Sequence, residues 1–171
     1  MKRLRSKIMW LVYYEFNYGY GQVFRKWWKA FFWSHYLKSV GAKPSIHPTV
    51  LLRGAENIEI GNNVNLNHGT ELYGNGGISI GDNSMLAYNV MVFSDSRKFK
   101  GKELLKSIKG RDLAPVSIGA DVWVGAGAII MPGVQIADHA IVAAGSVVTR
   151  NVGEWEIVGG NPAVLISSRI S

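Results

Sequence analysis

Aliphatic residues recur every six positions through most of this chain. The longest run places them at 118, 124, 130, 136, 142 and 148, and shorter runs occupy 60, 66, 72, 78 and 80, 86, 92. The segments "IEIG" (58–61), "ISIG" (78–81) and "VSIG" (116–119) mark comparable points. Such a strict short period predicts a repeat architecture.

A six-residue step with one inward aliphatic and a small neighbour suits a short strand followed by a tight turn. Three steps close a triangular coil of about 18 residues, and stacked coils form a parallel β-helix. An α-helix does not fit, because six is incommensurate with a 3.6-residue period and Gly, Asn, Asp and Val dominate. We therefore predict an all-β solenoid over residues 40–171, with a loop insertion at about 94–114 and about five coils.

Residues 1–39 have a different pattern and form a separate segment. Aromatic residues at three- and four-residue steps predict a helix over 22–38. The uninterrupted apolar run, 8–14, is too short to span a bilayer. Two interpretations stay open, since a helix of this kind can pack on the body or on a neighbouring subunit, or can lie on anionic lipid as an interfacial anchor.

Charge separates the same two regions. Residues 1–39 hold eight Lys or Arg and one Glu, whereas residues 40–171 hold eleven basic and eleven acidic residues. No nucleic-acid-binding motif accompanies the basic segment, so we expect no nucleic-acid partner. The loop 97–111 carries seven cations and one acid. It is either a solvated loop or a collar for a polyanionic acceptor, such as a nucleotide-linked or lipid-linked sugar.

The chain contains no cysteine, which excludes disulfides, thiolate metal sites and cysteine nucleophiles. This composition suits a reducing cytoplasm. The basic segment further suggests that the protein acts at the inner surface of the membrane. Zinc enzymes on β-helices need three converging imidazoles. The four histidines include no pair that is close in sequence, so we expect no metal.

Three segments resemble the hexapeptide-repeat acyltransferases: "ISIGDN" (78–83), "VSIGADVWVGAGAIIMPGVQIADHAIVAAGSVVTRNV" (116–152) and "IVGGNPA" (157–163). The likeness is greatest to the sugar O-acetyltransferase branch, which includes maltose and galactoside acetyltransferases. The resemblance implies a left-handed parallel β-helix, a homotrimer, and acetyl-CoA as cosubstrate in a groove between neighbouring subunits.

The resemblance also implies a donor site. It places the pantetheine arm against small residues beside a tryptophan, and the adenosine phosphates near a Thr–Arg pair, in which Arg can serve a phosphate. The small residues also suit plain coil geometry. The residues concerned are Trp123, Ala126, Ala144, Gly145, Thr149 and Arg150.

The expected catalytic residues match the family only in part. Asn67 matches an asparagine that the family places beside the acetyl group, but the family's catalytic histidine aligns with Arg97 or Lys98. Neither is a base at neutral pH. Three interpretations remain: His68 or Asp95 replaces that histidine, the acceptor is an amine, or the chain is an inactive trimeric scaffold that binds membrane or a partner. We expect a sugar of a cell-surface polysaccharide precursor to be the acceptor.

Overall fold

The structure is a computed structural model that describes residues 33–170. The helix expected over 22–38 therefore lies largely outside the described residues, and only 33–36 are seen to be helical. Contacts divide the chain after Tyr36, and the second unit, from Leu37 onward, is described below. No helix within 33–170 is long and apolar enough to cross a membrane.

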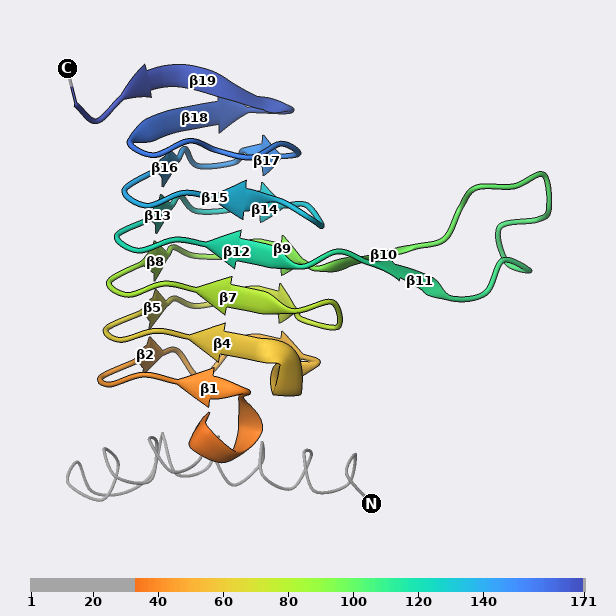
Figure 1. Ribbon diagram of the computed structural model, residues 1–171, viewed down its shortest axis with the longest axis horizontal. Helices are drawn as coiled ribbons and strands as arrows, with labels where there is room; N and C mark the ends of the chain where they lie inside the picture. Colours follow the sequence, from red (N-terminus) through yellow and green to blue (C-terminus); the bar gives the residue numbers. More distant parts are fainter. Residues whose placement is uncertain (1–32, 171) are drawn as a thin grey trace. The chain divides into compact units, whose positions relative to one another are not determined.

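The second unit is a parallel β-helix with three sheets, here named A, B and C (Figure 1). Sheet A contains β1 (Ser39–Val40), β4 (Ile58–Ile60), β7 (Ile78–Ile80), β12 (Val116–Ile118) and β15 (Gln135–Ile136). Sheet B contains β2 (Ser45–Ile46), β5 (Asn65–Leu66), β8 (Met85–Leu86), β13 (Trp123–Val124), β16 (Ile141–Val142), β18 (Glu156–Gly160) and β19 (Ala163–Ser168). Sheet C contains β3 (Leu51–Arg53), β6 (Glu71–Tyr73), β9 (Met91–Phe93), β14 (Ile129–Ile130) and β17 (Val147–Val148). A 3₁₀ turn, η1 (Ala55–Asn57), follows β3.

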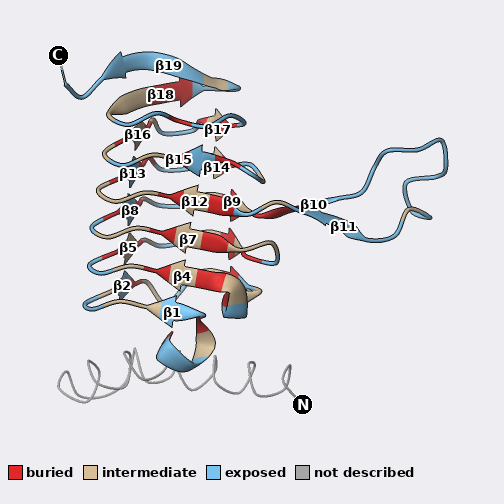
Figure 2. Ribbon diagram, viewed as in Figure 1, coloured by how far each residue is buried: buried red, intermediate tan, exposed pale blue. Residues whose placement is uncertain are grey.

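The inward positions of the hexapeptide pattern form the core. Every aliphatic in the three six-residue runs is buried, and Leu66, Leu86 and Ile130 are completely inaccessible (Figure 2). Each fully buried side chain of this size contributes about 1.5–3 kcal/mol relative to exposure. The predicted solenoid and its period are confirmed.

Coil length changes along the stack. Equivalent residues are 20 positions apart in the lower coils, as for Asn65 and Met85, and 18 apart in the upper coils, as for Trp123 and Ile141. The expected 18-residue coil therefore holds only for the upper part. There are six levels rather than about five, because the first coil begins at Ser39 and Val152 adds a last bridge to sheet A.

The turns between strands align into three corners, which we name AB, BC and CA after the sheets they join. Corner BC comprises 47–50, 67–70, 87–90, 125–128 and 143–146. The outer face of sheet A is polar, with Ser39, Glu59, Ser79, Ser117 and Gln135. The outer faces of sheets B and C, on either side of corner BC, carry polar Ser45, Asn65 and Glu71 in the lower coils. At the levels above these, they carry Met85, Trp123, Ile141, Met91, Ile129 and Val147.

The expected insertion is an arm that projects from corner CA (Figure 1). Its base is an antiparallel pair, β10 (Asp95–Arg97) and β11 (Arg111–Leu113), with Asp95 opposite Leu113. The loop 98–110 is exposed almost throughout.

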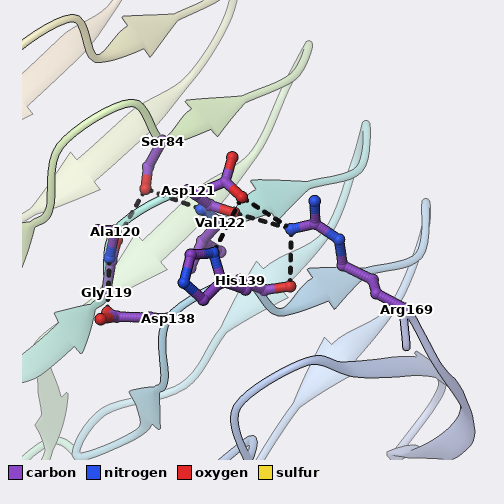
Figure 3. Close-up of polar contacts among 8 residues, drawn as sticks. All are labelled: Ser84, Gly119, Ala120, Asp121, Val122, Asp138, His139 and Arg169. Atoms are coloured by element: carbon purple, nitrogen blue, oxygen red, sulfur yellow. Dashed lines mark hydrogen bonds and ion pairs between the residues drawn. The ribbon is translucent and has the colours of Figure 1, made fainter. Parts of the chain in front are cut away.

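The last turn of the chain is fastened to corner AB by a polar cluster (Figure 3). Nη1 of Arg169 donates to Asp121 Oδ2 at 3.0 Å and to the His139 carbonyl at 2.9 Å. The His139 ring hydrogen-bonds the same carboxylate at 3.0 Å and stacks on Trp155, with centroids 4.0 Å apart. The hydrogen bonds from His139 and then Arg169 hold the pKa of Asp121 below its usual range.

Candidate functional site

Four residues of corner BC form a vertical column, here called the BC column: His68, Tyr88, Ala126 and Ala144. Backbone hydrogen bonds join the turns that carry them, from Asn89 to the His68 carbonyl (2.9 Å), from Gly127 to Tyr88 (2.8 Å) and from Gly145 to Ala126 (2.8 Å). Neighbouring levels of a sheet are about 4.8 Å apart, so the column is about 14 Å long. It is long enough to accompany an extended ligand.

The upper half of the column is bare. Ala126 and Ala144 are exposed, and a β-carbon built on Gly127 or Gly145 meets nothing within 4 Å. Both glycines have left-handed φ values, 68° and 69°, which glycine adopts without strain. Within residues 33–170, the backbone N–H groups of the two alanines donate to no other group. The surface therefore offers close approach to a thin chain and two hydrogen-bond donors.

The lower half of the column contains His68, and a second imidazole, that of His47, lies against it. His68 is exposed, and its ring lies 5.2 Å from that of His47 in an edge-to-face arrangement. Nδ1 of His47 accepts from the Thr49 N–H at 3.3 Å and lies 2.9 Å from the Thr49 hydroxyl. These contacts hold the His47 ring in place, and the His68 ring packs against it.

Asn67 lies one position below His68 in the same turn. Its Nδ2 donates to the Leu86 carbonyl of the next coil at 2.9 Å. One amide hydrogen thus fixes the side chain, and the second hydrogen and Oδ1 have no partner within residues 33–170. Asn67, which we predicted to orient the acyl group, is therefore next to the candidate base His68. Its Oδ1 and one amide hydrogen remain available to a ligand.

Asp95 occupies a different environment. Its carboxylate is inaccessible, forms an ion pair with the half-exposed Arg111, and accepts from Asn75 Nδ2 at 3.0 Å. Its Oδ1 has no hydrogen-bond partner among residues 33–170. The residue lies at the root of the arm in corner CA, away from the BC column, and its contacts are those of a group that fastens the arm.

The position that aligns with the family histidine is also committed to the arm. Nη2 of Arg97 donates to the Leu105 carbonyl at 2.9 Å, and Lys98 is exposed. Arg97 therefore orders the arm backbone.

The remaining expected donor-site residues lie beside the column rather than in it. Trp123 is half exposed on the outer face of sheet B, in register with Met85 and Ile141. Thr149 and Arg150 are exposed where β17 leads into corner CA. Sequence reasoning did not single out Tyr88 or Arg111, and it did not place His47 beside His68. The spacing of 20 residues in the lower coils would have placed Tyr88 directly above His68.

Within residues 33–170, no group of three His, Asp or Glu side chains is placed to hold a metal ion. The close His47–His68 pair was not expected from the sequence, because a whole coil separates the two residues. It brings together two imidazoles without a third ligand.

A solenoid of three-sided coils with a six-residue period and an exposed column of small residues defines the class of hexapeptide-repeat proteins. A family model described as bacterial transferase hexapeptide (six repeats) matches residues 115–150. The galactoside O-acetyltransferase of Escherichia coli K12 is 30% identical over 165 residues, which cover 96% of this chain and 78% of that protein.

Solved structures agree. A maltose O-acetyltransferase from Clostridium difficile 630 superimposes with a TM-score of 0.82 at 28% identity, covering 97% of this chain and 85% of the other. A galactoside acetyltransferase in complex with coenzyme A gives a TM-score of 0.82 at 27% identity, with coverages of 98% and 80%. The chain belongs to the hexapeptide-repeat acetyltransferase family.

Proposed function

We propose that this chain transfers the acetyl group of acetyl-CoA to a hydroxyl of a sugar, with the donor along the BC column and His68 as the base. The observation that carries the proposal is the column itself. The chain belongs to an acetyltransferase family, and the upper half of its column is a surface of small residues. There the N–H groups of Ala126 and Ala144 donate to no group within residues 33–170, and the exposed His68 lies two levels below Ala126.

The residues present fit the donor. Acetyl-CoA, when bound, supplies an acyl thioester that is activated toward nucleophiles. Ala126, Ala144 and Gly145 have no side chain beyond the β-carbon, so a pantetheine arm can lie against the backbone and accept hydrogen bonds from it. Trp123 flanks this surface, and Arg150 beside Thr149 supplies a guanidinium for phosphate.

His68 is the better candidate base. A neutral imidazole takes the proton of the acceptor hydroxyl as that oxygen attacks, provided that it lies within hydrogen-bond reach. The His68 ring is exposed and packs against the His47 ring, whereas the Asp95 carboxylate is inaccessible and faces Arg111. Asn67 has a free amide hydrogen with which to hold an acyl oxygen.

We further propose that the protein is a homotrimer with its donor sites between subunits. From the level of Met85 and Met91 upward, the outer faces of sheets B and C are apolar and meet at corner BC, whereas the face of sheet A is polar. Three copies that turn corner BC inward would cover the apolar faces and bring neighbouring surfaces to each column. Contiguous exposed apolar surface of this kind marks interaction sites.

We expect the acceptor to be a sugar of a cell-surface polysaccharide precursor, linked to a nucleotide or a lipid, in the cytoplasm or at its membrane surface. The named relatives are galactoside and maltose O-acetyltransferases, which supports a sugar hydroxyl. The cationic arm supports a phosphate-bearing carrier.

Calorimetric titration with acetyl-CoA tests the donor site. We expect micromolar binding, weakened by Arg150→Ala and by Ala144→Leu, which places a branched side chain on the bare surface. The matched control is Ala42→Leu, an exposed alanine in a turn of corner AB. His68→Ala should keep binding and lose transfer, measured as thiol release with sugar acceptors, while Asp95→Asn should retain transfer.

The alternative is a scaffold without catalytic activity. This alternative is favoured by Arg97 and Asp95, because both side chains bind residues of the arm. Absence of acetyl-CoA binding up to millimolar concentration would make the scaffold the better description. Binding with transfer unaffected by His68→Ala would retain the enzyme and remove His68 as its base.

A further inference from the structure

The arm carries a charge opposite to that of the body from which it projects. Residues 97–111 hold seven cations and one acid, a net charge of +6. This leaves four of the eleven basic and ten of the eleven acidic residues for the remainder of 40–171, a net charge of −6. The apparent neutrality of the β-helix region therefore hides a strong separation of charge.

The arm cations are not neutralised by the body. Of the seven, only Arg111 forms an ion pair within residues 33–170, with Asp95 at the base. The other six have no such partner in the part of the chain that the structure describes, and all six are exposed.

Large apolar side chains project among these cations. Leu104 is 81% exposed, Phe99 62% and Leu105 60%. The backbone of Leu104 and Leu105 is held by hydrogen bonds. The Leu104 carbonyl accepts from the Ser107 N–H at 2.8 Å and hydroxyl at 2.7 Å, and the Leu105 carbonyl accepts from Arg97 at 2.9 Å. The two leucines are held at a turn with their side chains in solvent.

We propose that the arm docks on an anionic lipid bilayer, with Leu104 and Leu105 inserted at the level of the headgroups and the surrounding cations on lipid phosphates. Apolar side chains beside Lys and Arg are the combination that binds membrane interfaces. The bilayer surface is favoured because it matches both features of the arm: it presents a sheet of negative charge with an apolar layer just beneath it.

The proposal is independent of catalysis and of residues 1–32. Each cation near an anionic surface strengthens binding about fivefold. Binding should therefore fall about fivefold in Lys106→Gln, and should weaken as salt screens the charges. Lys43→Gln, at an exposed lysine in corner AB, is the control and should bind as the parent chain does.

A fluorescent label locates the contact. Because the chain has no cysteine, Leu105→Cys and Leu165→Cys each accept one environment-sensitive label in the full-length protein. Leu105 and Leu165 are equally exposed, at 60%, but Leu165 lies in β19, outside the arm. Vesicles of phosphatidylcholine alone are compared with vesicles of equal parts phosphatidylcholine and phosphatidylglycerol.

We expect a blue shift of the label at 105 with the anionic vesicles, little shift with the neutral ones, and none at 165. Vesicle binding without a shift at 105 would show that another segment makes the contact. A lipid-independent shift at 105 that grows with protein concentration would show that a second copy covers the arm. Either result, an equal shift on neutral vesicles, or absence of binding to anionic vesicles would overturn the proposal.

Discussion

Substitution of Arg169 by alanine should release the C-terminal hairpin without unfolding the lower coils. The guanidinium joins the end of β19 to corner AB, where it donates to the Asp121 carboxylate at 3.0 Å and carbonyl at 3.3 Å, and to the His139 carbonyl at 2.9 Å. It also lies 5.5 Å over the Trp155 ring.

The size of the effect follows from these contacts. A half-exposed ion pair contributes about 0.2–1 kcal/mol, two carbonyl hydrogen bonds about 0.5–1.5 kcal/mol each, and the cation–π contact about 0.5–1 kcal/mol. The Arg169 side chain is about one-third exposed, so the lower halves of these ranges apply, and we expect a loss of about 2 kcal/mol. For a chain of this size, that corresponds to a fall in Tm of about 4–8 °C.

Thermal unfolding combined with amide hydrogen exchange measures both size and location. Coils contact only their neighbours, so faster exchange should be confined to β18, β19 and the turn of Trp155, while β4 to β6 stay protected. Arg169→Lys is the matched control and should keep the ion pair, so it should lose less stability than Arg169→Ala. An unchanged Tm in Arg169→Ala, or an equal loss of protection in every coil, would refute the reasoning.

Three further predictions concern the core, the arm and pH. Leu86→Ala should lower the free energy of denaturant unfolding by about 2–5 kcal/mol because the side chain is completely buried, whereas Leu104→Ala should have almost no effect; equal losses would contradict the assigned core. Arg111→Met should destabilise the protein by about 2 kcal/mol by leaving the buried Asp95 carboxylate with Asn75 alone, and adding Asp95→Asn should recover stability; no recovery would show that the charge is not the cause. The pKa values of Asp121 and Asp82 are lowered, the latter by hydrogen bonds from Asn62, so these carboxylates stabilise the fold above the ordinary aspartate pKa of about 3.9 and lose that effect as the pH falls through their folded values. Asp121→Asn should flatten the acid limb of a stability–pH curve, and an unchanged limb would exclude Asp121 as its source.

The fold could be predicted because its determinants are local and repeated. The inward aliphatic residues, at positions such as 118, 124 and 130, all occupy the same buried environment. The predicted fold would therefore be the same if one of them were assigned wrongly. The lengths of the individual coils were harder to predict from the sequence. The two extra residues of the lower coils lie in corner CA, where no hydrophobic spacing constrains them, as the eight positions from Glu71 to Ser79 show.

Only part of the candidate site could be predicted from the sequence, because its geometry depends on the register between coils. Ala126 and Ala144 could be read from a motif, and the structure places them in one column with His68. His47 is a whole coil away from His68 in sequence, and nothing local indicates that their rings meet. Asp95 looked like a base by position, but its burial and its bond to Arg111 arise from the pairing of the two arm strands.

Corner CA has a consequence for how such chains diversify. Four residues, 74–77, join β6 to β7, whereas 22 residues, 94–115, make the equivalent connection from β9 to β12, and the strands on both sides remain in register. Length at this corner is therefore decoupled from the stack. Recombination at two points, after Phe93 and before Val116, can transplant, shorten or delete an arm in a single step while corner BC stays as it is. A lineage can thus change its arm without altering the turns of corner BC.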